Sequence, residues 1–536
     1  MRAILLILVF FSTMLPAIAQ EDAWVYFTGK PNADFYLDNP LEMLSQKALD
    51  RRAVQGIELD EMDVPLHQDY VDGVEATAGI TVMARSKWLN AVHVRGLYEN
   101  IELLANLDYV SSIEYANKML NTPGRPAQTL EINAVNKQLD VAVNLDYGMG
   151  SNQIQMLNGH ILHQEDYTGT GMTIAVMDSG FPGVDTAGPF QRLQDNGLIL
   201  GGYNFVNGDE NVYTANQHGT LVLSTIGGYV EGGLIGTAPD AFYYLFVTED
   251  TTGENPVEES YWVEAAEMAD SLGVDVINTS LGYFDYDNPA YNYTYEHLNG
   301  QTSFVSRGAN IAFSRGMICV TSAGNSGNSA DPYIQVPADA FNTLTVGAVN
   351  FEETREGFSS IGFTADGRIK PDVMAQGSGV IYAKPDGTIS FGNGTSFSSP
   401  ITAGLVACLW QAFPEKTNVE ILELVKGSAD RFTNPGPEYG YGIPDFAFAL
   451  NELAVSELSK QGFVLYPNPV KNLLNVALPT DVSNASLTVY NSLGQIVMQH
   501  ELTASTAISL GGLSTGLYSY RIDSASRVKM GKLIKE

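Results

Sequence analysis

Residues 391–410 read FGNGTSFSSPITAGLVACLW, a cluster of small and hydroxyl residues followed by an apolar run. If the apolar run forms a helix, almost every face of that helix is apolar, which predicts a helix buried in a core. Pro400 is expected in the first turn of that helix, where its missing N–H costs nothing. Ser396 therefore lies at the start of a buried helix, where a hydroxyl either caps the helix or acts as a nucleophile.

Upstream of this helix, short apolar stretches alternate with helical patterns. Continuous apolar runs of strand length are typical of strands covered on both faces, so they predict a mainly parallel α/β sheet. The stretches are MTIAVMD (172–178), DAFYYLFVT (240–248), VDVINTSL (274–281), GMICVTSAGN (316–325) and TLTVGAVN (343–350). Two segments with helical spacing that end in glycine lie between them, SYWVEAAEMADSLG (260–273) and GANIAFSRG (308–316).

Three more polar residues lie where function collects in such a sheet, at strand ends and helix starts. Asp178 ends an apolar strand, and His218 precedes Gly219 at the head of an apolar helix. Taken alone, the aspartate is a common turn or cap residue and the histidine a common surface residue. A serine nucleophile, however, needs a base and an acid that orients the base. Asn325, at another strand end, could donate a hydrogen bond to an oxyanion, worth roughly 3 to 4 kcal/mol in the transition state.

Four motifs in this order resemble those of the subtilases, the subtilisin-like serine proteases of peptidase family S8. They are AVMDSG (175–180), HGT (218–220), SAGN (322–325) and GTSFSSP (394–400), and further matches are GTAPDA (236–241), DVINTSLG (275–282), VPADAFNTLTVGAVN (336–350) and KPDVMAQG (370–377). The order Asp, His, Ser is that of subtilisin, unlike the orders of chymotrypsin and the α/β-hydrolases. Phe397 and Ser398 replace the usual Met and Ala after the serine.

The resemblance implies a role for each site residue. Ser396 attacks the scissile carbonyl, His218 takes and returns the proton, and Asp178 orients the imidazole. Asn325 and the backbone N–H of Ser396 form the oxyanion hole. The segment Ser280-Leu281-Gly282 resembles the strand that pairs with extended substrate and lines the first specificity pocket, although a buried sheet strand would read the same way.

The composition limits the partners and cofactors. The formal charge of −33 disfavours nucleic acid and anionic lipid surfaces. Seven His and two Cys exclude a Cys-rich zinc module, and Cys319 and Cys408 lie in apolar runs that predict buried, inert thiols. No cofactor is expected for the chemistry. Structural calcium is left open, because the short segment after His218 holds no counterpart of the family's calcium-binding loop.

The N-terminus predicts a signal peptide at residues 1–19. Arg2 is followed by an apolar stretch from Ile4 to Leu15 and by an A-x-A site that would be cleaved after Ala19. No later stretch of about 20 apolar residues follows, so no transmembrane segment is expected. The mature protein is therefore expected to be exported.

Residues 20–125 predict a small α+β unit, and a Pro-, Gly- and Asn-rich cluster opens a connecting segment at 126–149. Strand-like TAGITVMARSKW (77–88) and YVSSIEY (109–115) flank helix-like LYENIELLANL (97–107). The unit loosely resembles the subtilase propeptide, which assists folding and blocks the active site. This implies that the chain's own propeptide is an inhibitory partner.

A linker is expected at 452–462, followed by an all-β sandwich at 463–536. Short strands there alternate with Pro, Gly and Asn. YPNPVKNLLNV (466–476), GLYSYRID (516–523) and the basic end RVKMGKLIKE (527–536) resemble the sorting domain of the type IX secretion system of the Bacteroidota. That machinery is the implied partner, and the implied location is the cell surface or the medium.

The expected fold is thus a subtilisin-like, mainly parallel α/β sheet covered by helices at 150–451, with a small α+β propeptide and a C-terminal all-β sandwich. The leading function is a secreted serine endopeptidase that cleaves protein or peptide substrates through an Asp-His-Ser triad and an acyl-enzyme. A catalytically silent subtilase-fold binding module and a surface adhesin remain as alternatives. The Tyr-rich stretch 283–297 is interpreted as either a substrate-contacting insertion or an ordinary surface loop.

Overall fold

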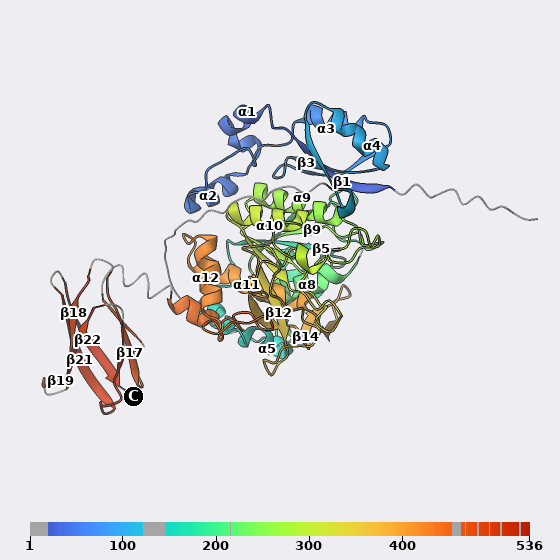
Figure 1. Ribbon diagram of the computed structural model, residues 1–536. Helices are drawn as coiled ribbons and strands as arrows, with labels where there is room; N and C mark the ends of the chain where they lie inside the picture. The colour runs from blue at the N-terminus through green and yellow to red at the C-terminus, as the bar shows by residue number, and fades with distance from the viewer. Residues whose placement is uncertain are drawn as a thin grey trace, which may run out of the picture.

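The computed structural model describes residues 20–121, 145–214, 216–452, 463–466, 468–479, 482–491, 494–503, 506–524 and 527–535 (Figure 1). The expected signal peptide, most of the connecting segment and almost all of the linker lie outside the described residues.

A seven-stranded parallel sheet forms the centre of the molecule, as the apolar stretches predict. The order is β13-β12-β11-β10-β5-β9-β6. All five predicted strands are present, and two further strands, β6 and β13, form the edges. The strands are β5 (Thr173–Asp178), β6 (Ile199–Asn204), β9 (Phe242–Val247), β10 (Val276–Thr279), β11 (Ile318–Ser322), β12 (Leu344–Val349) and β13 (Val373–Gln376).

Strand β5 lies where the direction of chain progression reverses. From β5 the chain runs out to β6, returns through β9 between them, and then crosses to β10 on the other side of β5. The carboxyl ends of strands at such a reversal point border a crevice. The end of β5 is therefore a natural place for a site.

Helices cover both faces of the sheet (Figure 1). On one face α8 (His218–Gly227), α11 (Thr395–Ala412) and α12 (Asn418–Gly427) share one hydrophobic core with the strands. On the other face α9 (Val257–Leu272) and α10 (Phe304–Ser314) belong to a second core. α11 is buried along nearly its whole length, as its apolar sequence predicts.

Smaller elements complete this unit. They are the helices α5 (Ser151–Gln155), α6 (Gly159–Gln164) and α7 (Gln191–Asp195), and the hairpins β7 (Tyr229–Val230) with β8 (Leu234–Ile235) and β14 (Val380–Ala383) with β15 (Ile389–Gly392). Tyr147 at the end of the connecting segment is buried in the first core. Cys319 and Cys408 are both free and buried, as expected.

The N-terminal unit is the predicted small α+β fold. Its antiparallel sheet has the order β2-β3-β1-β4 and a core of its own. The elements are β1 (Glu21–Phe27), α1 (Ala33–Asp38), α2 (Gln46–Gln55), α3 (Gln68–Glu75), β2 (Ile80–Ser86), β3 (Ala91–Gly96), α4 (Tyr98–Leu103) and β4 (Val110–Tyr115).

The sheet of this unit packs against α9 and α10 (Figure 1). Trp24 stacks on Phe304 of α10 with ring centroids 5.0 Å apart, and its Nε1 donates to Ser260 Oγ of α9 at 2.8 Å. The two units therefore share apolar and polar contacts across one interface.

The C-terminal unit is the predicted all-β fold. Two antiparallel sheets, β16-β17-β20 and β19-β18-β21-β22, enclose a core drawn entirely from residues 463–533. The strands are β16 (Val464–Tyr466), β17 (Leu473–Ala477), β18 (Ala485–Tyr490), β19 (Ile496–Leu502), β20 (Thr506–Ser509), β21 (Gly516–Ser524) and β22 (Val528–Lys535). None of the helices in the described parts of the chain is both long and apolar enough to cross a bilayer.

Candidate active site

Asp178 and His218 form the centre of the site. β5 ends on Asp178, whose side chain is fully buried, and α8 begins on His218. His218 Nδ1 lies 2.8 Å from Oδ1 and 3.0 Å from Oδ2 of the carboxylate, and the Ser179 N–H also donates to Oδ1 at 2.7 Å. A carboxylate at Nδ1 holds the proton on that nitrogen and leaves Nε2 as the basic atom.

The protonation of His218 is set by two opposing effects. Burial lowers the pKa of the imidazole, but the charge of Asp178 and the hydrogen bond to it raise the pKa, and the net shift is upward. The pair is therefore arranged to stabilise an imidazolium, which is the species that forms when a histidine accepts a proton during catalysis.

Gly219 allows α8 to begin this close to β5. A Cβ at this position would lie 2.5 Å from the Gly180 carbonyl oxygen and 3.0 Å from Asp178 Cβ. Any larger residue would push the helix away from the strand and stretch the contact between His218 and Asp178.

Ser396 is the second residue of α11 and is half-buried. Its Oγ donates to the Ser280 carbonyl at 3.2 Å, so the hydrogen bond that the structure records for this hydroxyl goes to Ser280 rather than to His218. In return, Ser280 Oγ donates to the Ser396 carbonyl at 2.9 Å. The two serines thus join the start of α11 to the end of β10.

Pro400 departs from the expectation that it lies in the first helical turn. The helix begins at Thr395, so Pro400 lies in its interior, where a proline removes the bond to the carbonyl four residues earlier. That carbonyl belongs to Ser396, and the Ser280 hydroxyl supplies the missing donor. The substitution of one donor for another explains why a proline is tolerated here.

Asn325 follows β11 and is locked in one orientation. Its Oδ1 accepts from both the N–H and the Oγ1 of Thr395, each at 3.0 Å. Because the acceptor end of the amide is occupied, the donor end, Nδ2, is the part left for a ligand. Thr395 immediately precedes Ser396, so the amide is tied to the backbone that carries the serine.

The segment Ser280-Leu281-Gly282 continues from β10 and contacts the same elements. Ser280 bonds to Ser396 as described, and the Leu281 carbonyl accepts from Ser322 Oγ of β11 at 3.4 Å. The structure therefore brings this segment and Ser396 together, pairs Asp178 with His218, and ties Asn325 to the residue before Ser396. The part played by Thr395 is missed by sequence reasoning, although the residue lies inside the GTSFSSP motif.

Within the described residues, no group of three or more His, Cys, Asp or Glu side chains is arranged to hold a metal ion.

Comparison with known proteins assigns each unit to a family. Residues 169–443 match the subtilase family, residues 22–134 the peptidase S8 propeptide domain of the Bacteroidota, and residues 464–536 a secretion system C-terminal sorting domain. The sorting domain directs the chain to type IX export, and so to the cell surface or the medium.

Two curated relatives agree with the subtilase match. The chain is 31% identical over 306 residues to subtilisin NAT of Bacillus subtilis subsp. natto, covering 56% of this chain and 70% of the relative. It is 32% identical over 292 residues to subtilisin of Bacillus pumilus, covering 54% of this chain and 94% of the relative. The crystal structure of MycP1 with the N-terminal propeptide removed aligns with a TM-score of 0.44 at 23% identity, covering 56% of this chain and 96% of that one.

The subtilase match alone spans more than half of the chain and contains all four motifs that carry the site. The chain therefore belongs to the subtilase family, and it is a serine endopeptidase made with a propeptide and a sorting domain.

Proposed function

We propose that Ser396, His218 and Asp178 are the catalytic triad of this endopeptidase and that it cleaves peptide bonds through an acyl-enzyme. The observation that carries the proposal is the double contact between His218 Nδ1 and the buried Asp178 carboxylate, which leaves Nε2 free to act as a base. Ser396 supports it, because its hydroxyl rests on a weak acceptor, the Ser280 carbonyl, and can be taken over by a stronger base.

The steps follow from this arrangement. His218 Nε2 removes the Ser396 proton as Oγ attacks the scissile carbonyl, and the buried Asp178 charge stabilises the imidazolium. Asn325 Nδ2 and the Ser396 N–H, at the positive end of α11, bind the oxyanion. His218 then protonates the leaving amine, and water releases the acyl group by the same route.

Substrate is expected to bind in an extended conformation along Ser280-Leu281-Gly282. This segment follows a buried strand and bonds directly to the residue proposed as the nucleophile, so a peptide paired with it would present its carbonyl to Ser396. The oxyanion contacts from Asn325 would then lie on the far side of that carbonyl.

The N-terminal unit is proposed to act as an inhibitory propeptide, and the divisions proposed from the sequence fit this role. A signal peptide at 1–19 would precede a propeptide at 20–125, a connecting segment at 126–149 and a catalytic unit at 150–451. A linker at 452–462 would then lead to the sorting domain at 463–536. The interface with α9 and α10 supports the inhibitory role, because it holds the propeptide on the catalytic unit. In this scheme the chain is exported as an inactive precursor and becomes active when the propeptide is lost.

A fluorophosphonate probe, which reacts only with an activated serine, tests the proposal and separates it from a silent binding module or an adhesin. The processed wild type should be labelled, and Ser396→Ala should not. Ser398→Ala is the matched control, because Ser398 lies in the same helical turn and donates its hydroxyl only to the Thr395 carbonyl. An unlabelled wild type, or labelling that survives Ser396→Ala, would refute the triad.

A further inference from the structure

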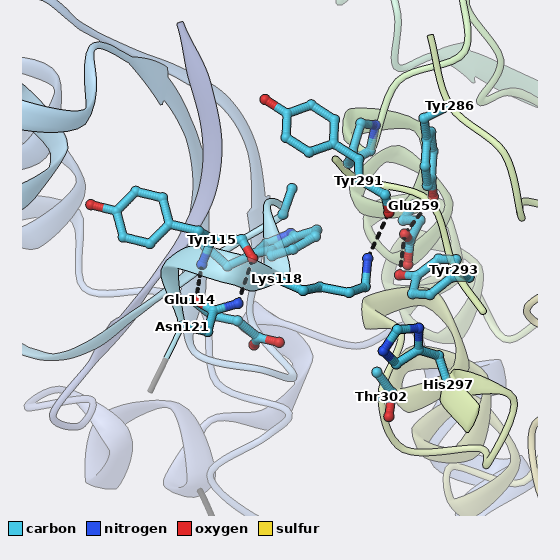
Figure 2. Close-up of a pocket in the computed structure, with 13 residues that line it drawn as sticks. Glu114, Tyr115, Lys118, Asn121, Glu259, Tyr286, Tyr291, Tyr293, His297 and Thr302 are labelled. Atoms are coloured by element: carbon cyan, nitrogen blue, oxygen red, sulfur yellow. Dashed lines mark hydrogen bonds between the residues drawn. The ribbon is translucent and has the colours of Figure 1, made fainter. Parts of the chain in front are cut away.

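A cavity of about 280 Å³ lies at the interface between the propeptide and the catalytic unit (Figure 2). The catalytic side of the cavity comes from α9 and from the Tyr-rich stretch 283–297. Tyr286, Tyr291 and Tyr293 of that stretch are all at least nine-tenths buried with the propeptide in place, whereas Asp285, Asp287 and Pro289 are exposed. We call this side the lysine pocket; it consists of Glu259, Tyr286, Tyr291, Tyr293, His297 and Thr302.

A propeptide lysine enters the pocket. Figure 2 shows Lys118 extending from the propeptide toward the Tyr-rich stretch. Its Nζ lies 4.1 Å from the centroid of the Tyr293 ring and donates to the Tyr291 carbonyl at 2.6 Å. An ammonium over an aromatic face gains about 0.5 to 2 kcal/mol, and more as water is excluded. The contact is therefore a specific one for a cation.

The pocket is held in shape by its own hydrogen bonds. The buried Glu259 carboxylate accepts from the hydroxyls of Tyr286 and Tyr293, each at 2.6 Å, and from the Val305 N–H at 3.0 Å. None of these bonds involves Lys118, so the ring face and the negative charge are in place before a lysine enters. Burial lowers the pKa of Lys118, and the Glu259 charge opposes that shift.

The propeptide in turn fixes the lysine. Lys118 begins a short 3-10 helix, Lys118–Leu120, whose first turn is capped by the Asn117 side chain accepting from the Met119 N–H at 3.2 Å. Asn121 then exchanges two hydrogen bonds of 2.7 Å with the Tyr115 backbone. Both sides of the contact are thus ordered by their own units, which is what a recognition contact requires.

Another propeptide lysine shows what an ordinary contact across the same interface looks like. Lys47 pairs with Asp275 at 2.9 Å and also donates to the Thr173 hydroxyl, and no aromatic ring contact is recorded for it within the described residues. The Lys47 side chain is 42% exposed, although that of Asp275 is only 12% exposed, so water screens the ammonium end of the pair and its contribution is expected to be small. Lys47 therefore serves as the matched control for Lys118.

We propose that the lysine pocket is a binding site for a primary ammonium group, and that its occupation by Lys118 retains the propeptide on the enzyme after the chain between them is cut. The inference deepens the proposed propeptide inhibition. It assigns to the Tyr-rich stretch a role that neither interpretation of its sequence contained.

The test measures how fast the cut propeptide leaves, in a chain that cannot cut itself. A recognition sequence for a sequence-specific endoprotease is placed within residues 122–144 of the full-length Ser396→Ala chain, the chain is cut, and dissociation is followed from an immobilised N-terminal tag. Lys118→Met should dissociate about tenfold faster than the parent, and Lys47→Met within about threefold of it. Equal rates for the two variants would overturn the proposal. Because no proteolytic activity is measured, that outcome would leave the proposed triad untouched.

A double-mutant cycle identifies the aromatic partner. Tyr293→Leu removes the ring and should speed dissociation, and adding Lys118→Met should then have little further effect, because the two changes remove the same contact. Additive effects would show that the ring does not bind the lysine. If the Tyr293→Leu variant does not fold, Tyr293→Phe replaces it in the test, because phenylalanine keeps the ring face. The propeptide should dissociate from the Tyr293→Phe variant as slowly as from the parent, and adding Lys118→Met should again speed dissociation.

Discussion

The pairing of Asp178 with His218 allows a prediction of how the activity depends on pH. In the proposed mechanism activity requires neutral His218, so activity should fall as the pH drops through the pKa of that residue, and the Asp178 charge places this pKa above its ordinary value. In Asp178→Asn the charge is lost and burial dominates, so the acid limb of the kcat/KM profile should move to lower pH. We expect kcat to fall by about 10⁴, a magnitude taken from other Asp-His-Ser proteases.

The loss of kcat in Asp178→Asn is best compared with the loss of kcat in Ser396→Ala. It should cost about 10⁶ in kcat, the figure known for subtilisin itself, because the covalent step disappears, whereas Asp178→Asn only misorients the base. Turnover of a casein-type substrate by each variant, followed from pH 5 to 9, measures both. An acid limb that stays in place in Asp178→Asn would mean that His218 is not the titrating group.

Asn325→Leu should lower kcat by about 10² to 10³ with little change in KM, because in the proposed mechanism Nδ2 donates to a charge that exists only in the transition state. Thr395→Val is the graded control. It removes the hydroxyl that holds Asn325 Oδ1 but keeps the backbone N–H that does the same, so it should cost less than Asn325→Leu. Steady-state kinetics on a peptide substrate test both. A rise in KM at constant kcat would instead indicate ground-state binding.

At the scale of single residues the sequence predicts which residues take part but not how their side chains are held. The Asp, His, Asn and Ser motifs are contiguous patterns, and each can be read without a fold. The lock between Asn325 and Thr395 joins residues 70 apart, and the propeptide lysine finds its ring 175 residues away. Such contacts depend on where two elements end in space, and no local pattern encodes that.

The junction of β10 and α11 makes a prediction at the scale of elements. Ser280→Ala removes the donor that satisfies the Ser396 carbonyl, and leaving a buried acceptor unpaired costs about 1 to 3 kcal/mol. Pro400→Ala restores an N–H four residues after Ser396. The double variant should therefore regain part of the stability that Ser280→Ala loses, but not the part due to buried Asn278, whose Nδ2 donates to Ser280 Oγ at 3.1 Å.

This compensation can be measured as the unfolding rate in guanidinium. The Ser396→Ala chain is compared with the same chain carrying Ser280→Ala, Pro400→Ala or both. If the two effects simply add, the Ser280 hydroxyl does not replace the helical hydrogen bond.

The same junction shows the limit of sequence reasoning for elements. Apolar runs predict the strands and the buried helix correctly, but the place of Pro400 in that helix is set by a partner on another strand.

At the scale of the whole molecule, the propeptide and the catalytic unit meet at the acidic helix α9. On one side α9 packs on the catalytic sheet, and on the other its acidic residues meet the propeptide. Arg52 of α2 lies 2.8 Å from Asp270 and 2.6 Å from Asp63, with all three side chains at most 2% exposed. Glu267 accepts from the Ser86 hydroxyl and from the Trp88 N–H. The propeptide thus both covers these carboxylates of α9 and supplies the cation and the hydrogen-bond donors that pair with them.

The last prediction concerns the division of labour between units. The proposed site lies entirely within the unit built on the parallel sheet, whereas the strands of residues 463–535 enclose a core to which no residue before Phe463 contributes, within the described chain. A unit with its own core can be removed without leaving a cavity in its neighbour. Deleting residues 463–536 should therefore preserve peptide hydrolysis in a chain made with its propeptide, and should strand that chain in the periplasm of a host with type IX machinery.

Fusing the same residues to a periplasmic reporter should carry the reporter to the surface or the medium of that host, and not of one lacking the machinery. Immunoblots of cell fractions measure the location, and hydrolysis of a casein-type substrate measures the activity. A truncated chain that still reached the medium would show that export does not depend on this unit. A truncated chain that folds but no longer cleaves would show that the sandwich is a structural or substrate-binding module.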